Sequence, residues 1–114
     1  MMISASKEPL ELLQGTLDVL ILKTLTWGPM HGYGVAHSIR QKTADELRID
    51  DGALYTSLHR LEQRKWVRSE WGVTEQNRRA KFYSLTKQGR SALVARTQQW
   101  TRYATAVSRI LQPA

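Results

Sequence analysis

The chain has no cysteine among its 114 residues. It therefore has no thiol for a disulfide framework, a zinc–thiolate cluster or a cysteine nucleophile. Its longest uninterrupted apolar run, residues 19–22, is far shorter than the roughly 20 residues that a membrane-spanning helix needs. The first residues also lack the apolar stretch of a secretory signal peptide. We therefore expect a soluble, cytoplasmic protein with no membrane partner.

The sequence also lacks the patterns that enzymes and metal sites need. His31, His37 and His59 are the only imidazoles, and none falls in a tight pair with a carboxylate within one helical turn. No nucleophile–histidine–acid order, phosphate-cradling glycine loop or evident pair of catalytic carboxylates is present. We predict that the chain is not an enzyme and holds neither metal nor cofactor. His31 is expected to cap a helix or pack at a turn.

Acidic residues become scarce in the second half of the chain. Residues 1–59 contain five Lys/Arg and seven Asp/Glu, whereas residues 60–90 contain nine and three, and residues 91–114 contain three and none. The net charge of +7 therefore arises after residue 59. Such a localised positive field favours a polyanionic partner such as nucleic acid. A merely solvated basic surface would have the same composition.

Residues 50–62 combine a helical apolar stripe with a polar face. Leu54, Leu58 and Leu61 recur at the i, i+4, i+7 spacing of a helix that packs one side against a core. Asp50 can cap this helix by accepting free amide hydrogens of its first turn. Side chains off the leucine stripe can hydrogen-bond to DNA, and the predicted DNA-binding residues are Tyr55, Thr56, Ser57, His59 and Arg60.

A basic hairpin is predicted directly after this helix. Residues 66–71 and 80–85 read as two strands joined by residues 72–79, with Trp66 and Val67 anchoring the first strand to the core. Arg78, Arg79 and Lys81 are predicted to contact phosphate or a minor groove. Salt bridges with Glu70 or Glu75 are the alternative for one or two of them. A groove-fitting helix beside a basic hairpin predicts a winged helix-turn-helix that binds duplex DNA.

Two further helices and a short strand are predicted before the helix at residues 50–62, which we call the recognition helix. Residues 10–26 are predicted to form a helix with two apolar sides; the first comprises Leu13, Leu17, Leu20, Ile21 and Leu25, and the second Leu12, Val19 and Leu22. We expect one of these sides to face another subunit; a central helix within a monomer is the alternative. Residues 31–42 read as a helix with Tyr33, Ala36 and Ile39 inward. Residues 47–49 suggest a minimal strand that pairs with the hairpin.

The last 29 residues predict a long helix with a heptad seam. Thr86 can cap a helix that runs to about residue 111, and the seam comprises Leu93, Thr97, Trp100, Ala104, Val107 and Leu111. No other segment of this chain is long enough to cover that seam, which predicts a homodimer. Thr97 and Ala104 leave space beside Trp100, where a planar aromatic or cationic ligand could stack; ordinary dimer packing is the alternative.

These elements predict a mainly α (α+β) fold in one compact domain. Residues 1–85 form the winged helix-turn-helix, and residues 86–114 form the dimerisation helix. In order and spacing, several motifs resemble the PadR family of bacterial transcriptional regulators: LQGTL at residues 13–17, GPMHGY at 28–33, GALY at 52–55, LHRLE at 58–62 and RRAKFYSLTKQG at 78–89.

The resemblance implies a dimeric winged-helix repressor with a single C-terminal helix. It places Tyr55, Thr56, Ser57 and Arg60 on the recognition helix, and Arg79 and Lys81 on the wing. It also places Trp100 where some multidrug-sensing members carry an aromatic residue that stacks on planar ligands. The family often has Thr and Pro where this chain has Ala53 and Thr56, which implies different base preferences.

Three functions are consistent with the sequence. The first is a ligand-responsive repressor that binds a palindromic operator as a homodimer. The second is a DNA-binding protein that responds to no ligand. The third is a winged-helix module that binds protein or RNA.

Overall fold

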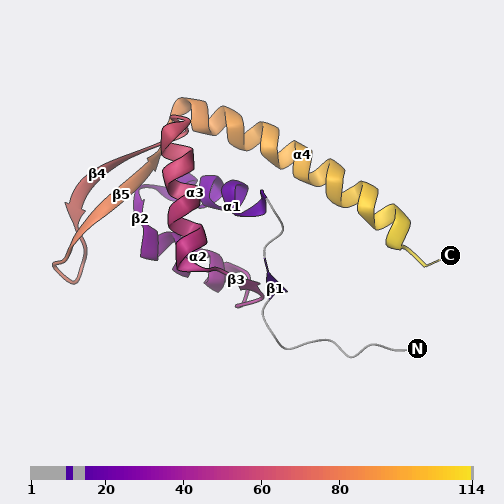
Figure 1. The fold of residues 1–114 in the computed structure, drawn as a ribbon, viewed down its shortest axis with the longest axis horizontal. Coiled ribbons are helices and arrows are strands. Elements are labelled where there is room, and N and C mark those ends of the chain that lie inside the picture. The colour runs from indigo at the N-terminus through magenta and orange to yellow at the C-terminus, as the bar shows by residue number, and fades with distance from the viewer. Residues whose placement is uncertain (1–9, 12–14, 114) are drawn as a thin grey trace.

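The computed structural model of the chain describes residues 10–11 and 15–113 (Figure 1). Its helices are α1 (Thr16–Thr24), the 3-10 helix η1 (Leu25–Trp27), α2 (Gly32–Lys42), α3 (Asp51–Gln63) and α4 (Lys87–Leu111). Its strands are β1 (Leu10–Glu11), β2 (Met30–His31), β3 (Leu47–Arg48), β4 (Val67–Val73) and β5 (Arg79–Leu85). None of the described helices is long and apolar enough to cross a membrane.

Helices α1, α2 and α3 enclose one hydrophobic core. The predicted leucine stripe of α3 is confirmed, because Leu54, Leu58 and Leu61 are all fully buried. They pack among Leu17, Ile21, Leu22, Leu25, Val35, Ala36 and Ile39. Because the leucine stripe is buried in this core, the opposite side of α3 faces solvent.

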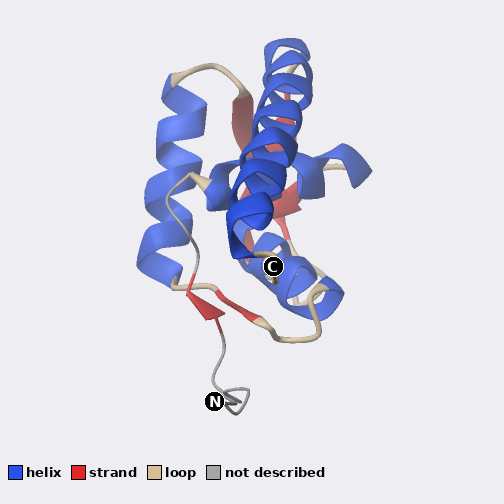
Figure 2. Ribbon diagram, turned by 90° about the vertical axis from the view of Figure 1, so that its right-hand side faces the viewer, coloured by secondary structure: helices blue, strands red, loops and turns tan. Residues whose placement is uncertain are grey.

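The wing is a three-stranded antiparallel sheet in the order β2-β5-β4. Met30 and His31 pair with Tyr83 and Phe82 across the β2–β5 ladder. The prediction that residues 47–49 pair with the hairpin is therefore wrong. β3 instead pairs in parallel with β1, away from the hairpin in Figure 2. The connection before α2 lies beside β5, so it takes the sheet edge that we had assigned to β3.

The start of the first helix also differs from the prediction. α1 begins at Thr16 rather than at residue 10, because Gly15 adopts a left-handed conformation with φ of 85° that a right-handed helix cannot continue through. Residues 12–14, including Leu12 and Leu13, lie outside the described residues. Leu22 was assigned to the second, outward apolar side, but it is fully buried in the core.

In α2, the prediction that Tyr33 points inward is wrong. Tyr33 is 69% exposed, whereas Val35, Ala36 and Ile39 are buried. The cause is local, because His31 is the N-cap residue and the helix begins at Gly32, which puts Tyr33 on the outer side of the first turn. The expected capping role of His31 is confirmed, since its Nδ1 accepts a hydrogen bond from the Gly34 amide at 3.1 Å.

Helix α4 starts at a tightly built joint and then leaves the domain. The predicted Thr86 cap is confirmed, because its Oγ1 accepts a hydrogen bond from the Gly89 amide at 2.9 Å. A Cβ atom at Gly89 would lie 2.0 Å from the Trp66 carbonyl oxygen, so only glycine fits there. The first half of α4 packs on α1, and its second half reaches past the winged domain (Figure 1).

Candidate nucleic-acid interface

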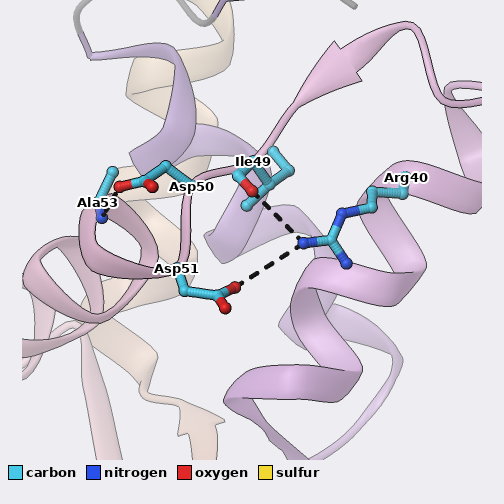
Figure 3. Close-up of polar contacts among 5 residues, drawn as sticks. All are labelled: Arg40, Ile49, Asp50, Asp51 and Ala53. Atoms are coloured by element: carbon cyan, nitrogen blue, oxygen red, sulfur yellow. Dashed lines mark hydrogen bonds and ion pairs between the residues drawn. The ribbon is translucent and has the colours of Figure 1, made fainter.

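The outer face of α3 carries a small set of polar and aromatic side chains. Tyr55 is 50% exposed, and Thr56 and His59 are exposed beside it. The predicted cap is confirmed, because the Asp50 carboxylate accepts a hydrogen bond from the Ala53 amide at 3.1 Å (Figure 3). The cap stabilises the first turn of α3, and the exposed face belongs to a regular α-helix of a size that fits into a DNA major groove.

Helix α2 fixes the N-terminal end of α3. The Arg40 guanidinium donates a hydrogen bond to the Ile49 carbonyl oxygen at 3.4 Å and lies 3.8 Å from an Asp51 carboxylate oxygen (Figure 3). The Tyr55 ring lies over the start of α2, where a Cβ atom on Gly32 would come within 2.7 Å of it. Glycine at this position therefore allows the two helices to approach closely.

Ser57 and Arg60 were both predicted to contact DNA, but Ser57 lies on the leucine side of α3 and the half-exposed Arg60 is engaged by a carboxylate of α1. Ser57 is buried. Arg60 donates hydrogen bonds to the Asp18 carboxylate at 2.6 Å and to the Ser57 hydroxyl at 3.2 Å. Ser57 follows Leu54 by three residues, so it lies on the leucine side of the helix. Sequence reasoning missed Asp18, whose signal was a lone acid within an apolar helix.

A second carboxylate, Glu62, joins α3 to the wing. It accepts a hydrogen bond from the Ser69 hydroxyl of β4 at 2.6 Å and lies 3.9 Å from the Lys81 ammonium of β5. Lys81 thus pairs with Glu62 rather than with the Glu70 or Glu75 considered from the sequence. Glu62 connects the last turn of α3 to both hairpin strands, which sets the angle between the helix and the wing.

The wing tip presents the other two predicted cations. Arg78 and Arg79 are exposed, and no carboxylate of the described residues lies within salt-bridge distance of either. The Arg79 guanidinium lies 4.7 Å from the centre of the Trp71 ring, a cation–π contact that orients it. These two charges are therefore available to an anionic partner.

A groove of about 590 Å³ lies between the start of α1 and the middle of α4. Trp100, Tyr103 and Arg96 line it from α4, and Thr16 and Val19 line it from α1. Of the residues predicted to surround a ligand, Trp100 lines this groove, whereas Thr97 and Ala104 are outside its lining. The ring centres of Trp100 and Tyr103 lie 6.2 Å apart.

Three helices around one core, a basic hairpin beside an exposed helix face, and a small antiparallel sheet define a winged helix-turn-helix DNA-binding protein. Residues 21–95 match the transcriptional regulator PadR-like family, and the chain belongs to this family. It is therefore a DNA-binding transcriptional regulator. The predicted fold and family are confirmed, and so is the prediction that the chain is not an enzyme, because the family consists of transcription regulators.

Solved structures support the same assignment. A transcriptional regulator from Clostridium thermocellum is 26% identical with a TM-score of 0.79, and the match covers 87% of this chain and 93% of that one. A PadR family regulator from Eggerthella lenta is 28% identical with a TM-score of 0.74, covering 89% and 86%. A PadR family regulator from Clostridium difficile is 25% identical with a TM-score of 0.73, covering 86% and 100%.

Tyr83, at the junction of α3 and the wing, should make the stability of the fold depend on pH in the alkaline range. Burial, and secondarily the charges of Glu62 and Tyr55, raise the pKa of Tyr83 above its ordinary value of 10.0. The folded state therefore favours the neutral phenol. Its contribution to stability is fully present below pH 10 and is lost as the pH rises through the folded pKa.

Replacing Tyr83 by Phe should therefore remove part of the alkaline loss of stability. Urea unfolding followed by circular dichroism between about pH 8 and pH 11 measures this loss around the tyrosine pKa. Tyr103→Phe, at an exposed position of α4, is the control and should leave the pH profile as in the parent protein. Identical profiles for the parent and Tyr83→Phe would contradict the assignment.

Proposed function

We propose that this regulator is a ligand-responsive repressor that binds a palindromic operator as a homodimer. The proposal rests on the combination of a single winged domain with a long helix, α4, whose second half extends beyond that domain. A single winged domain offers one recognition helix, and the apolar side of α4 continues past the domain that covers its first half. A second copy would supply both the missing cover and the second recognition helix.

The outer face of α3 is suited to read base edges in a major groove. Tyr55, Thr56 and His59 offer donors, acceptors and an aromatic face, and none of them is engaged in a side-chain hydrogen bond within the described structure. The wing cations Arg78, Arg79 and Lys81 would hold phosphates beside them. Ser57 and Arg60 would support this face from behind rather than read bases.

The overhanging half of α4 supports self-association. Leu93 packs partly against the core, and Trp100 and Val107 follow it at successive seven-residue intervals. Trp100 is 42% exposed, Val107 38% and Leu111 75%, so this side is open to solvent in one copy. Apolar side chains repeated along a straight helix are stabilised when a matching helix covers them.

The groove beside Trp100 supports a response to ligands. It is formed by α1, which packs on the recognition helix, and by α4, which would carry the dimer seam. Trp100 and Tyr103 offer flat aromatic surfaces to a planar compound. A ligand that fits only one separation of α1 and α4 would shift the spacing of the two recognition helices and release the operator.

Removing wing charges should weaken binding to every duplex. In Arg78→Ala/Arg79→Ala, operator and random DNA should both lose affinity, and the slope of log K against log salt should become shallower by about 0.9 per lost phosphate contact. Thr56→Ala and His59→Ala should instead change base preference at defined operator positions. Arg102→Ala/Arg109→Ala, which removes two exposed arginines of α4, is the charge-matched control. Unchanged affinity and slope in the wing variant would exclude the wing from the interface.

A charge on the heptad seam of α4 should dissociate the proposed dimer. Val107→Asp puts a charge on the uncovered apolar side of α4, so the species at twice the 13.1 kDa chain mass should dissociate, as measured by sedimentation or light scattering. Operator affinity should fall with it, because each half-site then binds without a linked partner. Thr105→Asp, two residues away on the other side of α4, should remain dimeric. A dimer that survives Val107→Asp would locate the subunit contact elsewhere.

The ligand prediction uses planar cationic dyes and tryptophan fluorescence. A dye that enters the groove should quench Trp100 and lower operator affinity, and Trp100→Ala should remove both effects. Trp27→Ala removes an exposed tryptophan outside the groove and should retain both. If quenching and operator release persist in Trp100→Ala, the ligand site lies outside this groove. If no dye binds the parent protein or any variant, the protein binds DNA without responding to such ligands.

A further inference from the structure

Asp18 is a carboxylate buried in the helical core. Its exposure is 4%, and it lies on α1 among the buried residues Leu17, Ile21 and Leu22. Its ion-pair partner in the described structure is Arg60 of α3, at 2.6 Å. Placing a carboxylate in such surroundings is unfavourable, and a well-packed apolar residue is often at least as stabilising there. The pair therefore calls for an explanation other than stability.

The pair links α3 to α1 on one side of the helix. The buried leucines hold α3 against the core through apolar contact, which is not directional. The Arg60 side chain adds directional bonds to Asp18 and to Ser57, at 2.6 and 3.2 Å. In a helix of 3.6 residues per turn, Arg60 lies about 140° around the axis from Tyr55. Fixing Arg60 to α1 therefore fixes where the Tyr55 face points.

We propose that Asp18 is a positioning residue for DNA reading: by holding Arg60, it sets the rotation of α3 and so selects the base edges that the outer face meets. This inference rests on the proposed reading of bases by Tyr55, Thr56 and His59. The same contact has a second effect. It keeps a half-exposed guanidinium directed towards α1, where it adds no sequence-independent attraction to phosphate.

The test compares specificity with stability. Operators are first selected from a random duplex library with the parent protein, and affinities for the selected operator and for random DNA are measured over a range of salt. Asp18→Leu/Arg60→Met replaces the ion pair by apolar side chains. Glu46→Leu/Arg109→Met removes the same two charges from exposed positions outside α3 and is the matched control. Urea unfolding reports the stability of each variant.

The apolar double variant should remain folded and bind DNA, but its operator-to-random affinity ratio should fall at least about tenfold, the scale of one lost base contact. The control should keep the parent ratio. A folded double variant with the parent ratio would overturn the inference. A parent protein that selects no operator would instead refute the proposed function, so the two failures are distinguishable.

Asp18→Asn provides a second test if the double variant does not fold. It keeps the shape of the side chain but removes the charge that holds Arg60, so the guanidinium becomes free to reach phosphate. Affinity for random DNA should rise, the salt slope should steepen by up to about 0.9, and the affinity ratio should fall. A ratio and a slope equal to those of the parent would refute a positioning role for Asp18.

Discussion

The burial of one side of α3 is the constraint on which the rest of this structure depends. Leu54, Leu58 and Leu61 are fully buried, so the opposite side of α3 faces solvent over its whole length. The other elements then fix that helix in position. Arg40 and the Asp50 cap secure its first turn, Asp18 holds it to α1, and Glu62 holds it to the wing. Apolar burial stabilises the packing of α3, and the polar contacts orient α3 relative to α1, α2 and the wing.

This division explains which parts of the fold could be predicted from the sequence. The leucine stripe and the caps at Asp50 and Thr86 are local, because each depends on residues within one or two helical turns. The order of a helix and a basic hairpin is local in the same sense. These features were sufficient to predict the winged fold and the exposure of Tyr55, Thr56 and His59 on α3.

What could not be predicted depends on which distant segments meet. Nothing in the periodicity around Leu47 distinguishes pairing with the hairpin from pairing with Leu10, and the left-handed conformation of Gly15 has no signature beyond glycine itself. Arg60 is the clearest case for the site. Its chemistry suits DNA, but a buried carboxylate 42 residues earlier engages it, and only the three-dimensional arrangement shows this.

Helix α4 is fixed at its N-terminal end by the contacts around Thr86, and its other end extends beyond the winged domain. The Thr86 hydroxyl also donates a hydrogen bond to the Lys65 carbonyl oxygen at 2.7 Å, and Gly89 lies against the Trp66 backbone, so the helix is anchored where α3 and the wing meet. Its 25 residues extend about 37 Å at 1.5 Å per residue. For a rigid rod of that length, a displacement of about 4 Å at the free end corresponds to a tilt of only about 6° at the anchored end. A displacement of the free end of α4 would therefore reach its anchored end as only a small change of angle.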